Sequence, residues 1–428
     1  MLSKIKNLKN SKSNPSAKSK ERYIVALDIG TEYVKALITK LTNKDAEIIG
    51  VGRARQNLGD MQAGAIADIA GVVANCDQAL SEAESQAGIS ARTAMIGIAG
   101  ELVKGTTTTV RCTRKDAKQP LDVHEVEKII NIVQKKSEER ARKQLAWELG
   151  GKEVEIRLVN SALVGIEIDG YKVTNPIGFQ GKDVVVQLYT AFAPLVHIGA
   201  LERTAHELDL DLLAVAAEPF AVARSVIGDN SGSSMSAILM DVGGGTTDIA
   251  VINDGGVQGT KMFGIGGRAY TKSIERELNM DFDKAEELKL DMQADTLNKE
   301  TIDKAKSALQ KTLGVWSNGV KLALSEFDQI DHLPKRVLLC GGGSSLEMLM
   351  DELSGTDWYK ELPFTAKPTV QHIQPDQVVG IVDKTGNVND HTFITAMGLL
   401  RVGIDTLQQE QGAPTGSVRE KIDRMLQV

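Results

Sequence analysis

Residues 239–252 read LMDVGGGTTDIAVI, where two apolar runs flank a short glycine-rich segment. The runs predict two strands, the first ending at Asp241 and the second beginning at Asp248. The glycines and threonines of the intervening turn are Gly243, Gly244, Gly245, Thr246 and Thr247. Glycines permit positive φ and close approach to the backbone, so successive N–H groups can point at one anion. The threonine hydroxyls add further donors.

The two aspartates decide what kind of anion fits this turn. A carboxylate such as Asp241 repels a bare phosphate, but it suits a divalent cation that sits between them and is held through waters. The segment therefore predicts a site for a phosphate with its magnesium. An ordinary glycine-rich hairpin with aspartates at the strand ends is the alternative.

A second copy of the pattern favours the phosphate site. Residues 26–38 read ALDIGTEYVKALI, in which a strand ends at Asp28 and is followed by Gly30, Thr31 and another strand. Two such hairpins facing each other across a cleft would hold a triphosphate from both sides. Asp28 and Asp241 would then face the same metal.

A third glycine-rich segment follows a buried strand in RVLLCGGGSSLEML (336–349). Its small residues are Gly341, Gly342, Gly343, Ser344 and Ser345. We expect the glycines to let a flat base approach the backbone, and the serines to occupy the N-cap position of a helix.

The three turns, in this order, resemble the first phosphate loop, second phosphate loop and adenosine loop of the actin and heat-shock chaperone ATPase superfamily. In AEELK (285–289) the resemblance implies that Glu286 and Lys289 contact ribose and base. In AAEPFAVA (216–223) it implies that Glu218 faces the water near the γ-phosphate. An exposed helix pair and a strand-end glutamate are the alternatives.

Two further consequences come from the same resemblance. The segment GIGGRAYTKSIERELN (264–279) is similar to a family segment, which implies that Gly266 and Gly267 border the nucleotide. Glu218 and Asp241 become the candidate catalytic residues. No side chain is a clear general base, so the sequence predicts ATP binding with at most slow hydrolysis.

The stretch between the two phosphate loops indicates which family of this superfamily the chain resembles. It predicts a charged helix from Asp122 to Trp147, followed by several strands. Within it, DGYKVTNPIGFQGKDVVVQLYTAF (169–192) resembles the bacterial cell-division protein family FtsA, in which a small SHS2-type subdomain is inserted in the first lobe. The resemblance covers about 22–401.

The predicted fold class is α/β, a two-lobed actin-like ATPase fold with an inserted small α+β (SHS2-type) subdomain in the first lobe. The expected parts are a basic tail (1–21), the first lobe (22–92 and 193–235), the insert (93–192), the second lobe (236–280 and 332–404), its small subdomain (281–331), a linker (405–416) and an amphipathic terminal helix (417–428).

The resemblance implies a division protein that binds ATP and magnesium, polymerises, and tethers FtsZ to the membrane. It places the FtsZ C-terminal peptide within 281–331 and other division proteins on the 93–192 insert. Two alternatives remain open: a pilus-assembly scaffold of the PilM type, and a small-molecule kinase or ATPase. A chaperone is disfavoured because little chain remains for a substrate-binding domain.

The composition and the two terminal segments give the remaining predictions about partners and location. The 428 residues carry a formal net charge of −7, which argues against nucleic-acid binding, and the three cysteines form no CxxC pair. Apolar residues at helical spacing in 417–428, with basic residues beside them, predict contact with an anionic membrane surface. The basic stretch at 1–10 predicts the same. The expected location is the cytoplasmic face of the cell membrane, peripheral, at the division site.

Overall fold

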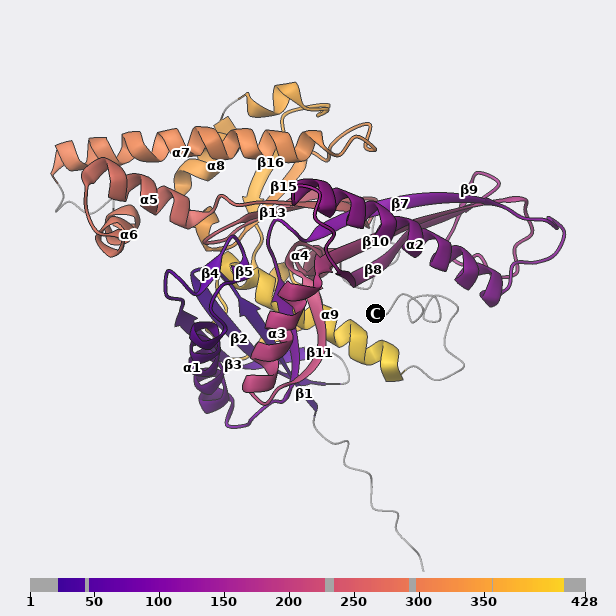
Figure 1. Ribbon diagram of the computed structural model, residues 1–428, viewed down its shortest axis with the longest axis horizontal. Coiled ribbons are helices and arrows are strands. Elements are labelled where there is room, and N and C mark those ends of the chain that lie inside the picture. Colours follow the sequence, from indigo (N-terminus) through magenta and orange to yellow (C-terminus); the bar gives the residue numbers. More distant parts are fainter. Residues whose placement is uncertain (1–21, 43–45, 228–234, 292–297, 356, 412–428) are drawn as a thin grey trace, which may run out of the picture.

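The computed structural model describes residues 22–42, 46–227, 235–291, 298–355 and 357–411, with side chains described to residue 408. In this part of the chain the main strands form a six-stranded sheet and a nine-stranded sheet. The sheets lie in different parts of the molecule, and helices cover their faces (Figure 1). Both predicted termini, 1–21 and 417–428, lie outside the described residues.

The six-stranded sheet is the centre of the first lobe, with the order β11-β6-β1-β2-β3-β17. Its strands are β1 (Arg22–Ile29), β2 (Tyr33–Leu41), β3 (Ala46–Arg55), β6 (Thr93–Ile98), β11 (Asp211–Ala217) and β17 (Ile381–Asp383). The lobe also contains a small hairpin, β4 (Met61–Gln62) and β5 (Ala65–Ile66), and the helices α1 (Ile69–Ala87), α3 (Leu195–Glu207) and α4 (Glu218–Ile227). Because helices cover the sheet, its strands are apolar along most of their length.

The nine-stranded sheet joins the second lobe to the insert, with the order β16-β15-β12-β13-β14-β7-β10-β8-β9. The second lobe contributes β12 (Ala237–Val242), β13 (Thr247–Asn253), β14 (Gly256–Phe263), β15 (Arg336–Cys340) and β16 (Thr369–His372). The insert contributes β7 (Lys104–Thr113), β8 (Ile156–Ile168), β9 (Tyr171–Val173) and β10 (Asp183–Pro194). Strands β14 and β7 pair antiparallel at Gly259↔Thr106 and Thr260↔Gly105, so the insert extends the second lobe's sheet.

The insert is a sheet covered on one side by a long helix, and it projects away from the lobes (Figure 1). Helix α2 (Val123–Glu148) begins after Asp122, whose side chain accepts a hydrogen bond from the backbone N–H of Glu125, 2.8 Å away. This agrees with the helix predicted from Asp122 to Trp147. Strand β6 falls within the range 93–192 but pairs with β1 in the first sheet.

The remaining helices of the second lobe gather beside its sheet. They are α5 (Gly267–Leu278), α6 (Phe282–Leu290), α7 (Lys299–Ser325) and α8 (Glu347–Gly355), with short turns η1 (Gly342–Ser345), η2 (Trp358–Glu361), η3 (Pro375–Gln377) and η4 (His391–Phe393). Buried Trp316 on α7 belongs to the core that these helices share with the sheet.

Helix α9 (Ile394–Gln411) returns the chain to the first lobe, where it packs on α4 and β1. It runs through residue 411 and so enters the range 405–416 that was expected to be a linker. Among the helices of the described residues, none has the length and apolarity needed to cross a membrane.

Candidate functional site

A cavity of about 330 Å³ lies between the two lobes, a volume within the usual range for small-ligand sites. Most of the predicted site residues line it: Asp28, Gly30, Thr31, Glu218, Asp241, Gly243, Gly244, Thr246, Asp248, Gly267, Glu286, Lys289, Gly341, Gly342 and Gly343. They come from positions more than 300 residues apart in the sequence. The fold therefore brings the three glycine-rich turns to one place.

Each phosphate loop is the turn of an antiparallel hairpin. In the first, Asp28 on β1 lies opposite Lys35 on β2. In the second, Asp241 on β12 lies opposite Asp248 on β13. The strands end at the same cavity, so each hairpin brings a carboxylate to it.

The second loop needs its glycines for close approach and not for backbone conformation. Gly243, Gly244 and Gly245 do not adopt the left-handed region, so the positive φ that glycine permits is not used at these positions. A Cβ on Gly244 would lie 2.8 Å from the Cβ of Glu32, and a Cβ on Gly245 would lie 2.7 Å from Oγ1 of Thr31. The two phosphate loops therefore touch each other.

The third turn differs from the prediction at its serines. Gly341 has φ of 81° and lies against Asp241, while a Cβ on Gly342 would meet no atom within 4 Å. The serines belong to the 3-10 turn η1, and α8 begins only at Glu347, so neither serine is its N-cap. Buried Ser344 donates to the carbonyl of Gly341 at 2.7 Å, and Ser345 lines the cavity in its place.

Three further predicted residues support the site without lining the cavity. The hydroxyl of Thr247 donates to the carbonyl of Ile265 at 2.7 Å and accepts from the indole N–H of Trp316 at 2.9 Å. It therefore points into the core and cannot donate to a phosphate. Gly245 and Gly266 lie where loops pack together, since a Cβ on Gly266 would be 2.6 Å from the carbonyl oxygen of Gly243.

Buried carboxylates dominate the electrostatics of the cavity. Burial, and then the charges of Asp28 and Asp248, raise the pKa of Glu218 well above its usual range. Burial likewise raises the pKa of Asp241, although the hydroxyl of Thr395 donates a hydrogen bond to its Oδ2. Burial and the charge of Asp241 raise the pKa of Asp248 well above its usual range. The cavity thus favours a bound cation.

These residues fit a magnesium ion that arrives with phosphate. Oδ1 of Asp248 is buried without a hydrogen-bond partner, which leaves an acceptor free in the cavity wall. In the described part of the chain, no group of three or more ligating side chains could hold a metal by itself. Magnesium usually keeps several waters and takes one or two carboxylates plus phosphate oxygens. Asp28 and Asp241 would hold it.

The pair Glu286 and Lys289 lies on α6 at the cavity edge. The ammonium of Lys289 donates to Oε2 of Glu286 at 2.7 Å and to Oγ1 of Thr271 at 2.9 Å. Lys289 is buried, which is unusual for a lysine on an exposed helix. The pair presents a carboxylate and an ammonium that suit the hydroxyls of a ribose.

Several cavity residues were absent from the sequence-based set, among them the polar residues Glu32, Lys35, Arg268 and Thr395. The first hairpin offered a signal for Lys35, because two strands joined by a tight turn place Asp28 and Lys35 opposite each other. Thr395 and Arg268 meet partners that lie 154 and 236 residues away in the sequence, so no local pattern identifies them.

Comparisons with known proteins support the resemblance to FtsA. The sequence model of the family "Cell division protein FtsA" matches residues 238–398. FtsA of Pseudomonas aeruginosa is 25% identical over 272 residues, which cover 63% of this chain and 60% of that protein. FtsA of Streptococcus pneumoniae is 27% identical over 277 residues, covering 64% and 56%. Matches to these two relatives thus span under two thirds of their length.

A longer match and a solved structure complete the comparison. FtsA of Enterococcus hirae is 24% identical over 392 residues, covering 86% of this chain and 84% of that protein. A chain of the PilM-PilN type IV pilus biogenesis complex superimposes with a TM-score of 0.63 at 17% identity, covering 89% of this chain and 98% of that one. The predicted resemblance and the actin-like α/β fold class are confirmed.

Proposed function

Because the chain resembles FtsA, we propose that it binds ATP with magnesium in the interlobe cavity and acts in bacterial cell division. In this role it polymerises and tethers FtsZ filaments to the cytoplasmic face of the cell membrane. The 93–192 insert contacts other division proteins. The protein is a nucleotide-dependent adaptor, with at most slow hydrolysis.

The observation that carries the nucleotide proposal is the contact between two facing hairpins around buried carboxylates. The two loops approach each other closely at Gly244 and Gly245, where an added side chain would meet Glu32 or Thr31. Lys35 adds a positive charge beside Asp28, at a distance of 2.9 Å. A magnesium ion would neutralise phosphate charge between Asp28 and Asp241. This arrangement suits a nucleoside triphosphate better than an uncharged ligand.

The protonation of Glu218 bears on its role in hydrolysis. Its raised pKa keeps a proton on the carboxyl group at pH values where an ordinary glutamate is ionised. A protonated carboxyl cannot accept a proton from water, although it can still orient one by donating a hydrogen bond. Cation binding would lower this pKa again. In the cavity without a cation, Glu218 therefore positions water more readily than it removes a proton.

Calorimetry with ATP and magnesium tests nucleotide binding. Asp241→Asn keeps the shape of the side chain but removes the metal-side charge, and we expect a loss of about a hundredfold in affinity. Asp254→Asn is the matched control, because Asp254 is exposed at the far end of the same hairpin. If the two variants bind equally well, the second phosphate loop is not the metal site.

Binding to FtsZ tests the division role. The full chain should retain FtsZ, and its C-terminal peptide, in a pull-down with ATP present. Lys306→Glu reverses an exposed charge within 281–331 and should weaken this binding, whereas Lys128→Glu on the insert should not. The opposite result would move the partner site to the insert.

The alternatives predict different outcomes in the same experiments. A pilus-assembly scaffold would bind ATP through the shared fold and would not retain FtsZ. A small-molecule kinase would consume ATP only when its acceptor substrate is present. Loss of FtsZ binding together with intact ATP binding would therefore favour one of these two.

A further inference from the structure

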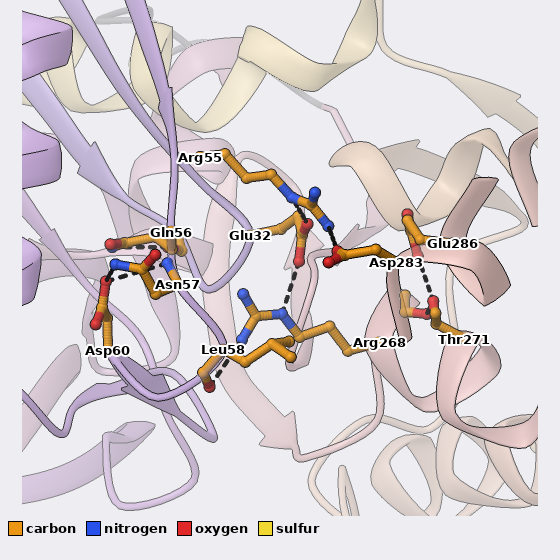
Figure 2. Close-up of polar contacts among 12 residues, drawn as sticks. Glu32, Arg55, Gln56, Asn57, Leu58, Asp60, Arg268, Thr271, Asp283 and Glu286 are labelled. Atoms are coloured by element: carbon orange, nitrogen blue, oxygen red, sulfur yellow. Dashed lines mark hydrogen bonds and ion pairs between the residues drawn. The ribbon is translucent and has the colours of Figure 1, made fainter. Parts of the chain in front are cut away.

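A chain of charged side chains crosses from one lobe to the other beside the phosphate loops (Figure 2). Glu32 of the first loop accepts from Nε of Arg268 on α5, at 2.6 Å. The other oxygen of Glu32 accepts from Nε of Arg55 on β3, at 2.8 Å. Arg55 in turn lies 3.3 Å from Asp283 on α6. The lobes are thus joined twice, once by Glu32–Arg268 and once by Arg55–Asp283.

The two links differ in burial. The side chains of Arg268 and Glu32 are only 9% and 17% exposed, whereas that of Asp283 is 77% exposed. Exposed ion pairs contribute little because water and salt screen them. Separating a buried pair is costly, because each charge loses its partner before water reaches it. The Glu32–Arg268 pair is therefore the stronger link.

This link is attached to both phosphate loops. Glu32 follows Thr31 directly, and its Cβ lies against the backbone of Gly244. The backbone N–H of Arg268 donates to the carbonyl of Gly244 at 2.8 Å. Movement of the lobes that separates the loops must therefore break the ion pair.

The guanidinium of Arg268 makes a second contact with the first lobe. Its Nη1 donates to the carbonyl of Leu58 at 3.4 Å, in the segment that follows β3 (Figure 2). In the same segment Gln56 donates to the carbonyl of Gly30 at 3.4 Å. One arginine from the second lobe thus contacts two parts of the first lobe that border the first phosphate loop.

We infer that Glu32 and Arg268 form a clasp between the lobes that sets how fast nucleotide leaves the cavity. The inference rests on the proposed nucleotide binding. Phosphates held between two touching loops leave when the loops separate, and the clasp opposes that separation. Both are positioning residues, because each acts on the loops through the other.

The test is the release rate of a fluorescent ATP analogue from the full chain with magnesium, measured by stopped flow after mixing with excess ATP. Glu32→Gln and Arg268→Gln should each release the analogue about tenfold faster, because each removes the charge pair. The double variant should release the analogue more slowly than the product of the two single effects predicts, because the Glu32–Arg268 pair can be lost only once.

Two controls are available in the chain itself. Arg276→Gln removes an exposed arginine from the same helix α5 and should leave the release rate unchanged. Asp283→Asn breaks only the exposed link and should change the rate less than about twofold. Unfolding midpoints close to that of the wild type would show that the variants remain folded. If Arg268→Gln does not fold, Glu32→Gln carries the test, since it removes charge without changing size.

Three results would overturn the clasp: wild-type release rates in both single variants, additive effects in the double variant, or slower release from Glu32→Gln. The last would mean that Arg268, once freed from Glu32, binds phosphate directly. If the wild-type chain itself fails to bind the analogue or ATP, the proposed function fails instead.

Discussion

The ammonium nitrogen of Lys35 lies 2.9 Å from Oδ2 of Asp28, directly across the hairpin that forms the first phosphate loop. Burial by itself lowers the pKa of Lys35, but the charge of Asp28 and their hydrogen bond outweigh it, so the pKa is raised overall. Lys35 therefore stays protonated inside the cavity. It supplies a positive charge next to carboxylates whose pKa values are raised.

Removing this ammonium should destabilise the fold. Lys35→Met keeps the approximate length of the side chain and leaves Asp28 buried without its partner ammonium. Breaking a buried pair in this way typically costs about 3–5 kcal/mol in the free energy of unfolding. Urea unfolding at neutral pH, without nucleotide, measures the loss.

Two comparisons make this prediction specific. Adding Asp28→Asn to Lys35→Met should recover much of the loss, because the unpaired charge is gone. Lys384→Met breaks an exposed pair with Glu47, whose charged atoms are 3.6 Å apart, and should cost less than about 1 kcal/mol. Equal losses for Lys35→Met and Lys384→Met would show that burial of the first pair has no energetic effect.

The open side of Gly342 allows a test of the adenosine loop. Gly342→Ala adds a methyl group where no atom lies within 4 Å, so the free energy of unfolding should not fall. If the base approaches this backbone, the methyl group takes its place, and ATP affinity should fall by about tenfold, or roughly 1.4 kcal/mol. Calorimetry and urea unfolding measure the two effects separately.

Neighbouring glycines serve as comparisons for that variant. Gly343→Ala would place a Cβ 2.8 Å from the carbonyl oxygen of Gly243 and should destabilise the fold itself. Gly314→Ala, in open space on α7, should leave ATP affinity unchanged. Unchanged affinity in Gly342→Ala as well would place the base elsewhere.

Local patterns predicted the parts of the site that are built from consecutive residues. Asp28 and Gly30 in one turn, and Asp241 and Gly243 in the other, follow from strand ends and glycines within a few positions. The sequence pattern gave a wrong prediction where packing decides which way a side chain points. Thr246 lies at the end of the turn and lines the cavity, whereas Thr247 is the first residue of β13 and its hydroxyl bonds to Ile265 and Trp316 in the core.

Contacts between residues far apart in the sequence could not be predicted, for a different reason. The ion pair of Glu32 with Arg268 depends on how the lobes meet, and nothing near either residue encodes that arrangement. The pairing of β14 with β7 has the same origin, since it joins strand edges from the second lobe and the insert. Hydrophobic patterns identify each strand but not its neighbour in the sheet.

The predicted membrane contact can be tested directly by liposome flotation. The full chain should float with anionic vesicles, since four apolar side chains within 417–428 and nearby basic residues could together contribute several kcal/mol. Deleting 417–428 should weaken flotation strongly, and deleting 1–20 as well should abolish it, because two weak anchors act together. Neutral vesicles are the control. A full chain that stays unbound even with ATP would be a soluble scaffold.

The raised pKa of Glu218 predicts how stability changes with pH in the absence of metal and nucleotide. Its ordinary value is 4.5, and the folded-state value lies well above this. Between these two values the folded chain binds more protons than the unfolded chain, so the contribution of Glu218 to the free energy of unfolding falls as pH rises. The loss is complete above the folded-state pKa.

Glu218→Gln isolates this contribution, because glutamine has the same shape and does not titrate. The measurement is the free energy of urea unfolding without magnesium, for the variant and the wild type, between pH 5 and pH 8. We expect the difference between variant and wild type to change in favour of the variant as pH rises, whatever its value at pH 5. Glu202→Gln, at an exposed position on α3, should show no such trend. Saturating magnesium and ATP should shrink the trend in Glu218→Gln, because a cation in the cavity favours the ionised carboxylate. A constant difference between wild type and Glu218→Gln across this pH range would mean that Glu218 is already ionised in the empty cavity.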